Sequence, residues 1–158
     1  MSIMEGEFAD IPEREIVQVM RFAYPFKEFS MDAIRRTAKA GIPIQYEAGD
    51  VIIRQSEEGD SMFLIIDGSV SLTTDLGELA TLSARRNQFR LLCKGDTFGE
   101  NALVWNDEHS DLWKSYSARE FQATAEDYCI IVEFSRNAML PVYLPSITNQ
   151  TSSPDFIL

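Results

Sequence analysis

Apolar residues change their spacing twice along this chain, and the changes divide it into three predicted regions. Residues 1–41 carry apolar side chains at the three- and four-residue spacing of a helix face. Residues 42–135 contain short apolar or β-branched runs separated by turn-forming residues, which is typical of strands. Residues 136–158 begin with a short predicted helix and continue into a polar tail. We therefore expect a single domain whose β-rich centre has helices on both sides.

Two helices are predicted in the first region. Asp10 is expected to cap the first helix, and Pro12 is expected to lie in its first turn, where proline is allowed. Pro25 ends this helix, since proline disrupts a helix interior. Ser30 is expected to cap the second helix, and Gly41 lies just past its end. The apolar faces are Ile16, Val19, Met20 and Ala23 in the first helix and Ala33, Ile34, Thr37 and Ala38 in the second.

Five apolar runs in the central region predict strands at 51–53, 62–66, 70–72, 89–93 and 129–132. The turns between them contain Gly-Asp three times, at 49–50, 59–60 and 95–96, and Asp-Gly once, at 67–68. Strands this short and this evenly spaced favour a sandwich, jelly roll or β-roll over a parallel α/β sheet. The predicted fold class is therefore mainly β with flanking helices.

Composition places the chain among ordinary globular proteins. Its 158 residues are enough to bury a core, and there is no run of 18 apolar residues that would predict a membrane span. The first residues lack the basic-then-apolar pattern of a signal peptide. Cys93 and Cys129 lie in apolar runs and are interpreted as buried thiols, which predicts a reducing, cytoplasmic location.

Charge argues against nucleic acid as a partner. The chain has 14 basic and 25 acidic residues, a net charge of −11, whereas proteins that bind nucleic acid neutralise phosphates with an excess of basic residues. The same charge means that an anionic small ligand would need a local cationic site.

The stretch 95–103 contains the residues with the most informative chemistry. It combines the end of a strand, Gly99 where backbone can approach a ligand, and the start of a helical turn. The free backbone N–H groups of Asn101 and Ala102 suit an anion, and Glu100 suits a sugar hydroxyl. Arg119 is the best-placed cation, because a guanidinium donates two parallel hydrogen bonds to a phosphate.

Residues 46–55, 59–68 and 98–103 resemble cyclic-nucleotide-binding domains, the β-roll sensors of kinase regulatory subunits, gated channels and a bacterial catabolite activator. The resemblance extends over about residues 20–140. It implies a domain that binds cAMP or cGMP, needs no other cofactor and no metal, and is not an enzyme. Because no effector segment is evident in the sequence, the resemblance also implies that a partner protein receives the signal.

The resemblance assigns a phosphate-binding cassette that runs from Phe98 and Gly99 to an arginine before the next strand. Aligning Ala125 with a late alanine of the family places Arg119 on the phosphate arginine. The implied ligand-binding residues are Phe98, Gly99, Glu100, Asn101, Ala102, Arg119, Glu120 and Phe121. A competing alignment places Ser117 on the arginine position, and the stretch 104–118 is longer than is usual in the family.

Two residues beside Arg119 keep a second hypothesis open. Glu120 would repel phosphate, and Phe121 would fill the pocket if it pointed inward. The alternative is a degenerate module of the same fold that binds proteins but no nucleotide. If a nucleotide binds, we expect cAMP over cGMP, because family members that bind cGMP often carry a threonine where this chain has Glu120. His109 is the only histidine and is interpreted as a loop residue, not a metal ligand.

Overall fold

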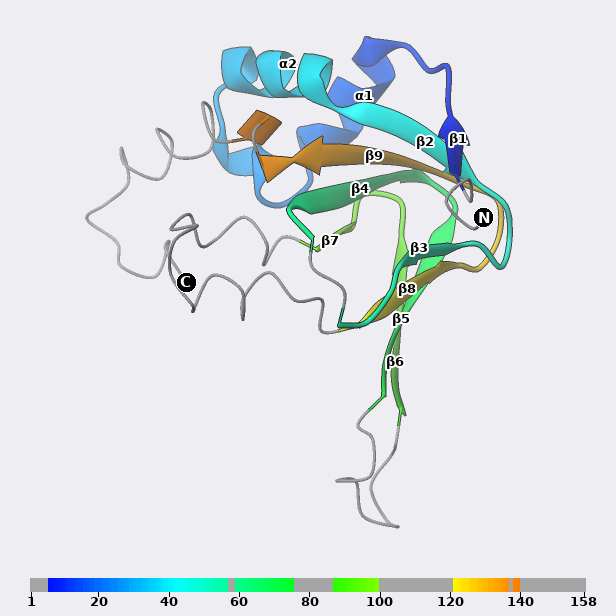
Figure 1. Ribbon diagram of the computed structural model, residues 1–158. Coiled ribbons are helices and arrows are strands. Elements are labelled where there is room, and N and C mark those ends of the chain that lie inside the picture. The colour runs from blue at the N-terminus through cyan, green and yellow to red at the C-terminus, as the bar shows by residue number, and fades with distance from the viewer. Residues whose placement is uncertain (1–5, 57–58, 76–86, 100–120, 137, 140–158) are drawn as a thin grey trace, which may run out of the picture.

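A computed structural model of the chain describes residues 6–56, 59–75, 87–99, 121–136 and 138–139. Two antiparallel sheets and a helical layer make up these residues (Figure 1). The first sheet has the strand order β1 (Gly6–Phe8), β2 (Ile42–Tyr46), β9 (Cys129–Ser135), β4 (Ser61–Asp67) and β7 (Thr97–Phe98). The second has the order β3 (Val51–Ile53), β8 (Gln122–Ala125), β5 (Ser69–Asp75) and β6 (Asn87–Cys93). The predicted mainly β class with flanking helices is confirmed.

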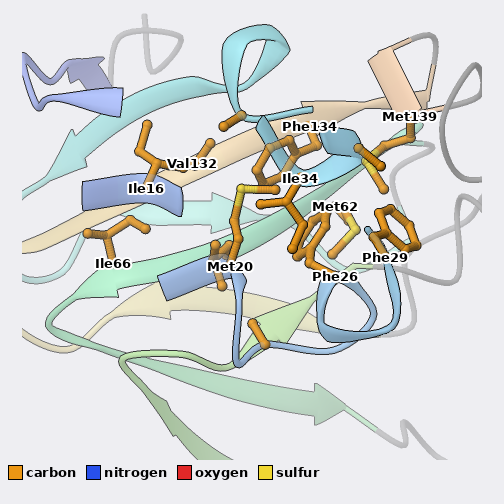
Figure 2. Packing of buried hydrophobic residues seen from close by; sticks show 14 residues of the cluster. Ile16, Met20, Phe26, Phe29, Ile34, Met62, Ile66, Val132, Phe134 and Met139 are labelled. Carbon is orange, nitrogen blue, oxygen red and sulfur yellow. The ribbon is translucent and has the colours of Figure 1, made fainter. Parts of the chain in front are cut away.

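Strands β4 and β9 lie in the middle of the molecule and are buried on both faces. On β4, Met62, Leu64 and Ile66 belong to one apolar cluster, whereas Phe63 and Ile65 belong to another. The first cluster, which we call the helix-side core, contains residues of the two helices (Figure 2). The second, the inter-sheet core, joins the two sheets. Burial on both faces explains why these strands are continuous apolar runs and not alternating ones.

Helix α2 (Met31–Ala40) matches its prediction. The Ser30 hydroxyl accepts a hydrogen bond from the N–H of Ala33 at 3.1 Å, and the predicted apolar face is buried. Gly41 follows the helix with an ordinary negative φ of −77°. Glycine is needed there for close packing, because a Cβ would lie 2.6 Å from the Val132 Cγ1.

Helix α1 (Glu13–Met20) begins later than predicted. Pro12 occupies the N-cap position with an extended backbone, and no side chain caps the helix, so the capping role predicted for Asp10 is wrong. The helix ends at Met20, before Pro25, and a 3₁₀ turn, η2 (Phe26–Glu28), follows. Ile16, Met20 and Ala23 are buried in the helix-side core, as their spacing predicts.

Four strands were not predicted: β1, β2, β7 and β8. Pro43 breaks the apolar pattern of β2, β7 has two residues, and β8 is made of small and polar residues. Each of them forms through pairing with a stronger neighbour, as Phe98 does opposite Phe63. Strand β1 lies in the region predicted as wholly helical and extends the first sheet by pairing with β2.

Candidate functional site

The predicted site begins and ends at residues that the structure describes. Phe98 ends strand β7 and Gly99 follows it, and Phe121 immediately precedes β8. The other five predicted ligand-binding residues lie outside the described residues: Glu100, Asn101, Ala102, Arg119 and Glu120. The same is true of His109 and Ser117. The described part therefore gives the frame that holds both ends of the cassette.

Phe98 fixes the first end to the inter-sheet core. Its ring stacks on Phe63, with centroids 5.1 Å apart and planes at 14°, and it is 2% exposed. Strand β7 pairs there with β4. A phenyl ring buried in this way anchors the backbone, and direct contact of its side chain with a ligand stays a prediction.

A tight turn before β7 sets its direction. Gly95 adopts a φ of +91°, and its N–H donates to the carbonyl of Ile65 at 2.9 Å. The N–H of Ile65 in return donates to the carbonyl of Asp96 at 3.0 Å. These two bonds fasten the entry to β7 onto β4 before the cassette starts.

Gly99 is the point at which the chain leaves the sheet. It is buried and has a φ of +81°, in the left-handed region that side-chain-bearing residues avoid. The sequence argument for a glycine here was close approach of backbone to a ligand. The structure adds a conformational reason, which is the left-handed backbone of Gly99.

Phe121 fixes the other end of the cassette. It is half-buried and packs against the inter-sheet core, the same cluster that holds Phe98. Strand β8 follows in the second sheet, with Ala123 and Ala125 buried in that core. Both ends of the stretch 100–120 are thus anchored to one rigid cluster, one end in each sheet.

Two residues that the sequence analysis did not single out position this frame. The Thr97 hydroxyl donates to the carbonyl of Tyr24 at 3.0 Å and so joins β7 to the segment after α1. Phe63 supplies the ring under Phe98. The sequence predicts that Phe63 lies in a strand, but it does not predict that this residue pairs with Phe98, 35 positions further along the chain.

The described residues contain no group of three or more His, Cys, Asp or Glu side chains placed to hold a metal ion. No helix in the described ranges is long and apolar enough to cross a membrane.

The sequence model of the cyclic nucleotide-binding domain matches residues 43–144, which is well over half of the chain. The chain belongs to the cyclic nucleotide-binding domain family. The matched segment includes strands β2 to β9 and the whole stretch between Gly99 and Phe121. The resemblance drawn from the sequence motifs is thereby confirmed.

Similar curated sequences are cyclic-nucleotide-regulated kinases by name. The chain is 43% identical over 65 residues to the cGMP-dependent protein kinase, isozyme 1, of Drosophila melanogaster, covering 41% of this chain and 8% of the kinase. It is 38% identical over 80 residues to the cGMP-dependent protein kinase egl-4 of Caenorhabditis elegans, covering 50% of this chain and 10% of the kinase. The chain therefore spans a small fraction of the length of these relatives.

Solved structures confirm the cyclic-nucleotide-binding β-roll. The regulatory domain of Toxoplasma gondii PKA, solved with cAMP, superposes with a TM-score of 0.71 at 17% identity, covering 89% of this chain and 48% of that one. The regulatory subunit of a cAMP-independent protein kinase A from Trypanosoma brucei gives a TM-score of 0.67 at 19% identity, covering 91% and 47%. A cyclic nucleotide-binding-like protein from Brucella abortus gives 0.59 at 18% identity, covering 79% and 94%.

Proposed function

We propose that this domain binds a cyclic nucleotide in the cassette between Phe98 and Phe121 and passes the signal to a partner protein. The observation that carries the proposal is the anchoring of both cassette ends to the inter-sheet core, in a chain of this family. A binding loop held at both ends by a rigid cluster loses less conformational entropy when it closes on a ligand.

The proposed contacts follow from chemistry. The backbone N–H groups of Asn101 and Ala102 and the guanidinium of Arg119 bind the phosphate, and the Glu100 carboxylate accepts from the ribose hydroxyl. A local cation is essential because the whole chain carries a net charge of −11. Without Arg119 nothing in this set would offset the charge of the phosphate.

Family membership does not fix which cyclic nucleotide binds. Glu120 in place of a threonine favours cAMP, as the sequence analysis predicts. The names of the curated relatives, which are cGMP-dependent kinases, weigh towards cGMP. The Trypanosoma brucei structure comes from a cAMP-independent kinase, so the fold does not decide the ligand. We retain cAMP as the proposed ligand and test it against cGMP directly.

The proposed output is a change in packing between the cassette and the helices. The Thr97–Tyr24 hydrogen bond provides a direct connection between β7 and the segment that joins α1 to η2. A ligand that repositions the cassette would act on this connection and shift the balance between two packings. We propose that a partner protein reads that shift and that the domain itself catalyses no reaction. Cys129 is buried as interpreted from the sequence, whereas Cys93 is exposed, so its interpretation as a buried thiol is wrong. Neither cysteine forms a disulfide, which supports our proposal of a reducing compartment such as the cytoplasm.

Titration calorimetry of the full chain with cAMP, cGMP and a cyclic dinucleotide tests the proposal. We expect saturable binding of cAMP, weaker binding of cGMP and none of the dinucleotide. Arg119→Ala should abolish binding, whereas Arg90→Ala, which removes an exposed arginine of β6, should leave it unchanged. Failure of both mononucleotides to bind at millimolar concentration would refute the sensor and favour the ligand-free interaction module.

A further inference from the structure

A groove of about 290 Å³ lies between helix α1 and the sheet. Its walls come from α1, from the end of β4 and the start of β9, and from the turn between β6 and β7. None of Phe98, Gly99 and Phe121 lines it. The nucleotide proposal therefore leaves this groove unexplained.

Half of the side chains that line the groove are aliphatic, and the other half are polar, including Gln18 of α1. Ile66 is buried at the base, next to the α1 residues Ile16 and Met20 in Figure 2. The remaining apolar lining is half-buried and consists of Ile11, Val19 and Ile130. Partly exposed aliphatic side chains gathered around one hollow gain free energy when an apolar group covers them.

The edge of the groove is charged and exposed. Glu15 of α1 and Asp67 after Ile66 contribute two carboxylates, and Lys94 contributes one ammonium group, which leaves one net negative charge. Across the described ranges, none of these three side chains forms an ion pair with another residue. Their charges are therefore available to an occupant.

A protein segment suits this groove better than a small molecule does. The volume of the groove is at the lower limit of the roughly 300–1,000 Å³ range of small-molecule pockets. Its exposed edge would leave a bound small molecule in contact with solvent. A segment that inserts one large apolar side chain and covers the edge matches the usual anatomy of a protein interface, an apolar anchor inside a polar rim.

We propose that this groove is a docking site for a partner segment that inserts an aliphatic side chain and carries arginine or lysine beside it. The aliphatic anchor lies over Ile66, and the basic neighbours pair with Glu15 and Asp67. Lys94 donates a hydrogen bond to a main-chain carbonyl of the segment. The charge complementarity of the two free carboxylates is what selects a basic partner.

The probe is a capped pentapeptide with one leucine between two arginines, acetyl-Gly-Arg-Leu-Arg-Gly-amide, titrated into the ¹⁵N-labelled full chain. We expect saturable amide shifts at Ile66, Asp67, Lys94 and Ile130. A peptide with serine for leucine keeps the charge and should bind at least tenfold more weakly. A peptide with glutamate for both arginines keeps the anchor and should also bind at least tenfold more weakly.

A matched pair of protein variants separates the groove from general charge. Glu15→Lys should weaken the leucine peptide at least tenfold. Glu13→Lys makes the same change of charge in the same first turn of α1, outside the groove, and should change affinity less than twofold. Equal losses in both variants, equal binding of the serine peptide, or no binding of the leucine peptide at millimolar concentration would overturn the proposal. The cyclic-nucleotide titration is independent, so either proposal can fail alone.

Discussion

At the scale of single residues, two of the Gly-Asp pairs, Gly49-Asp50 and Gly95-Asp96, form the same kind of turn. The N–H of Glu47 donates to the Asp50 carboxylate, and the N–H of Cys93 donates to the Asp96 carboxylate, each at 2.8 Å. The glycine before each aspartate has a φ above +90°. Each aspartate thus closes a turn whose glycine supplies the left-handed conformation, and the second of these turns aims β7 at the cassette.

A comparison of two glycines tests how much of their role is conformational. Gly95→Ala should cost about 1–2 kcal/mol, since φ is +91° but no atom lies within 4 Å of the added Cβ. Gly68→Ala should cost distinctly more, because φ is +92° and the Cβ would lie 2.9 Å from the Cα of Cys129. Urea unfolding measures both. Equal losses would show that the crowding at Gly68 is relieved by movement of the backbone.

In the sequence, Glu120 lies next to Arg119, the proposed phosphate-binding arginine. Most substitutions near a binding site weaken binding, but removal of this carboxylate should strengthen it. Glu120→Ala should tighten nucleotide binding several-fold, because a repulsion of about 1.4 kcal/mol corresponds to a tenfold loss of affinity. Calorimetry with cAMP measures it, and Glu126→Ala, in the turn after β8, is the matched control. Unchanged affinity in Glu120→Ala would mean that this side chain points away from the phosphate.

The buried thiol of Cys129 predicts a pH dependence of stability. Burial raises the pKa of Cys129 above its ordinary value of 9.0. Above pH 9 the unfolded thiol loses its proton while the folded one keeps it, so stability falls as pH rises. Between pH 8 and pH 10, the melting temperature should fall more steeply with pH for the wild type than for Cys129→Ala. Cys93→Ala, at an exposed position, should retain the wild-type slope.

At the scale of elements, β4 and β9 hold the molecule together because each contributes to both cores. Phe134 on β9 contacts Phe26 of η2, with ring centroids 5.0 Å apart, and two residues earlier Val132 enters the same helix-side core. Ile131, immediately before Val132, enters the inter-sheet core. The helices and the second sheet are therefore coupled through one pair of strands.

The cap of α2 gives an element-scale prediction. Ser30→Ala removes the hydrogen bond to the Ala33 N–H and should lower the free energy of unfolding by about 1 kcal/mol. Ser30→Asp restores an acceptor at the helix N-terminus and should recover most of the loss. Chemical denaturation measures both variants. No recovery with aspartate would mean that Ser30 acts through something other than capping.

At the scale of the whole molecule, the Thr97–Tyr24 hydrogen bond joins β7, the strand that leads into the cassette, to the segment after α1. If the nucleotide acts on the helices through it, cAMP should slow hydrogen exchange of amides 21–29 in the wild type. Thr97→Val removes the hydroxyl and should reduce this protection while cAMP still binds. Thr73→Val on β5 is the matched control. Full protection in Thr97→Val would place the coupling elsewhere.

The sequence was most informative where the local pattern and the final environment agree. Helix α2 has a capping serine and a periodic apolar face, and both act as predicted. Gly41 follows the helix as predicted, but its role there is close packing. The runs at 51–53 and 62–66 became β3 and β4. It was least informative for β8, whose residues Gln122–Ala125 are small or polar, because that strand exists through its pairing with β3 and β5.

The sequence by itself determined the family, the β-rich centre and the helices, because each rests on local motifs: the Gly-Asp turns, the strand runs and the segment 98–103. Tertiary structure decided what Phe98 and Phe121 do, since only folding brings them into one core from opposite sheets. It also decided the groove beside α1, whose lining residues come from segments far apart in the sequence. Contacts between residues far apart in the chain depend on register and packing, and no local pattern encodes them.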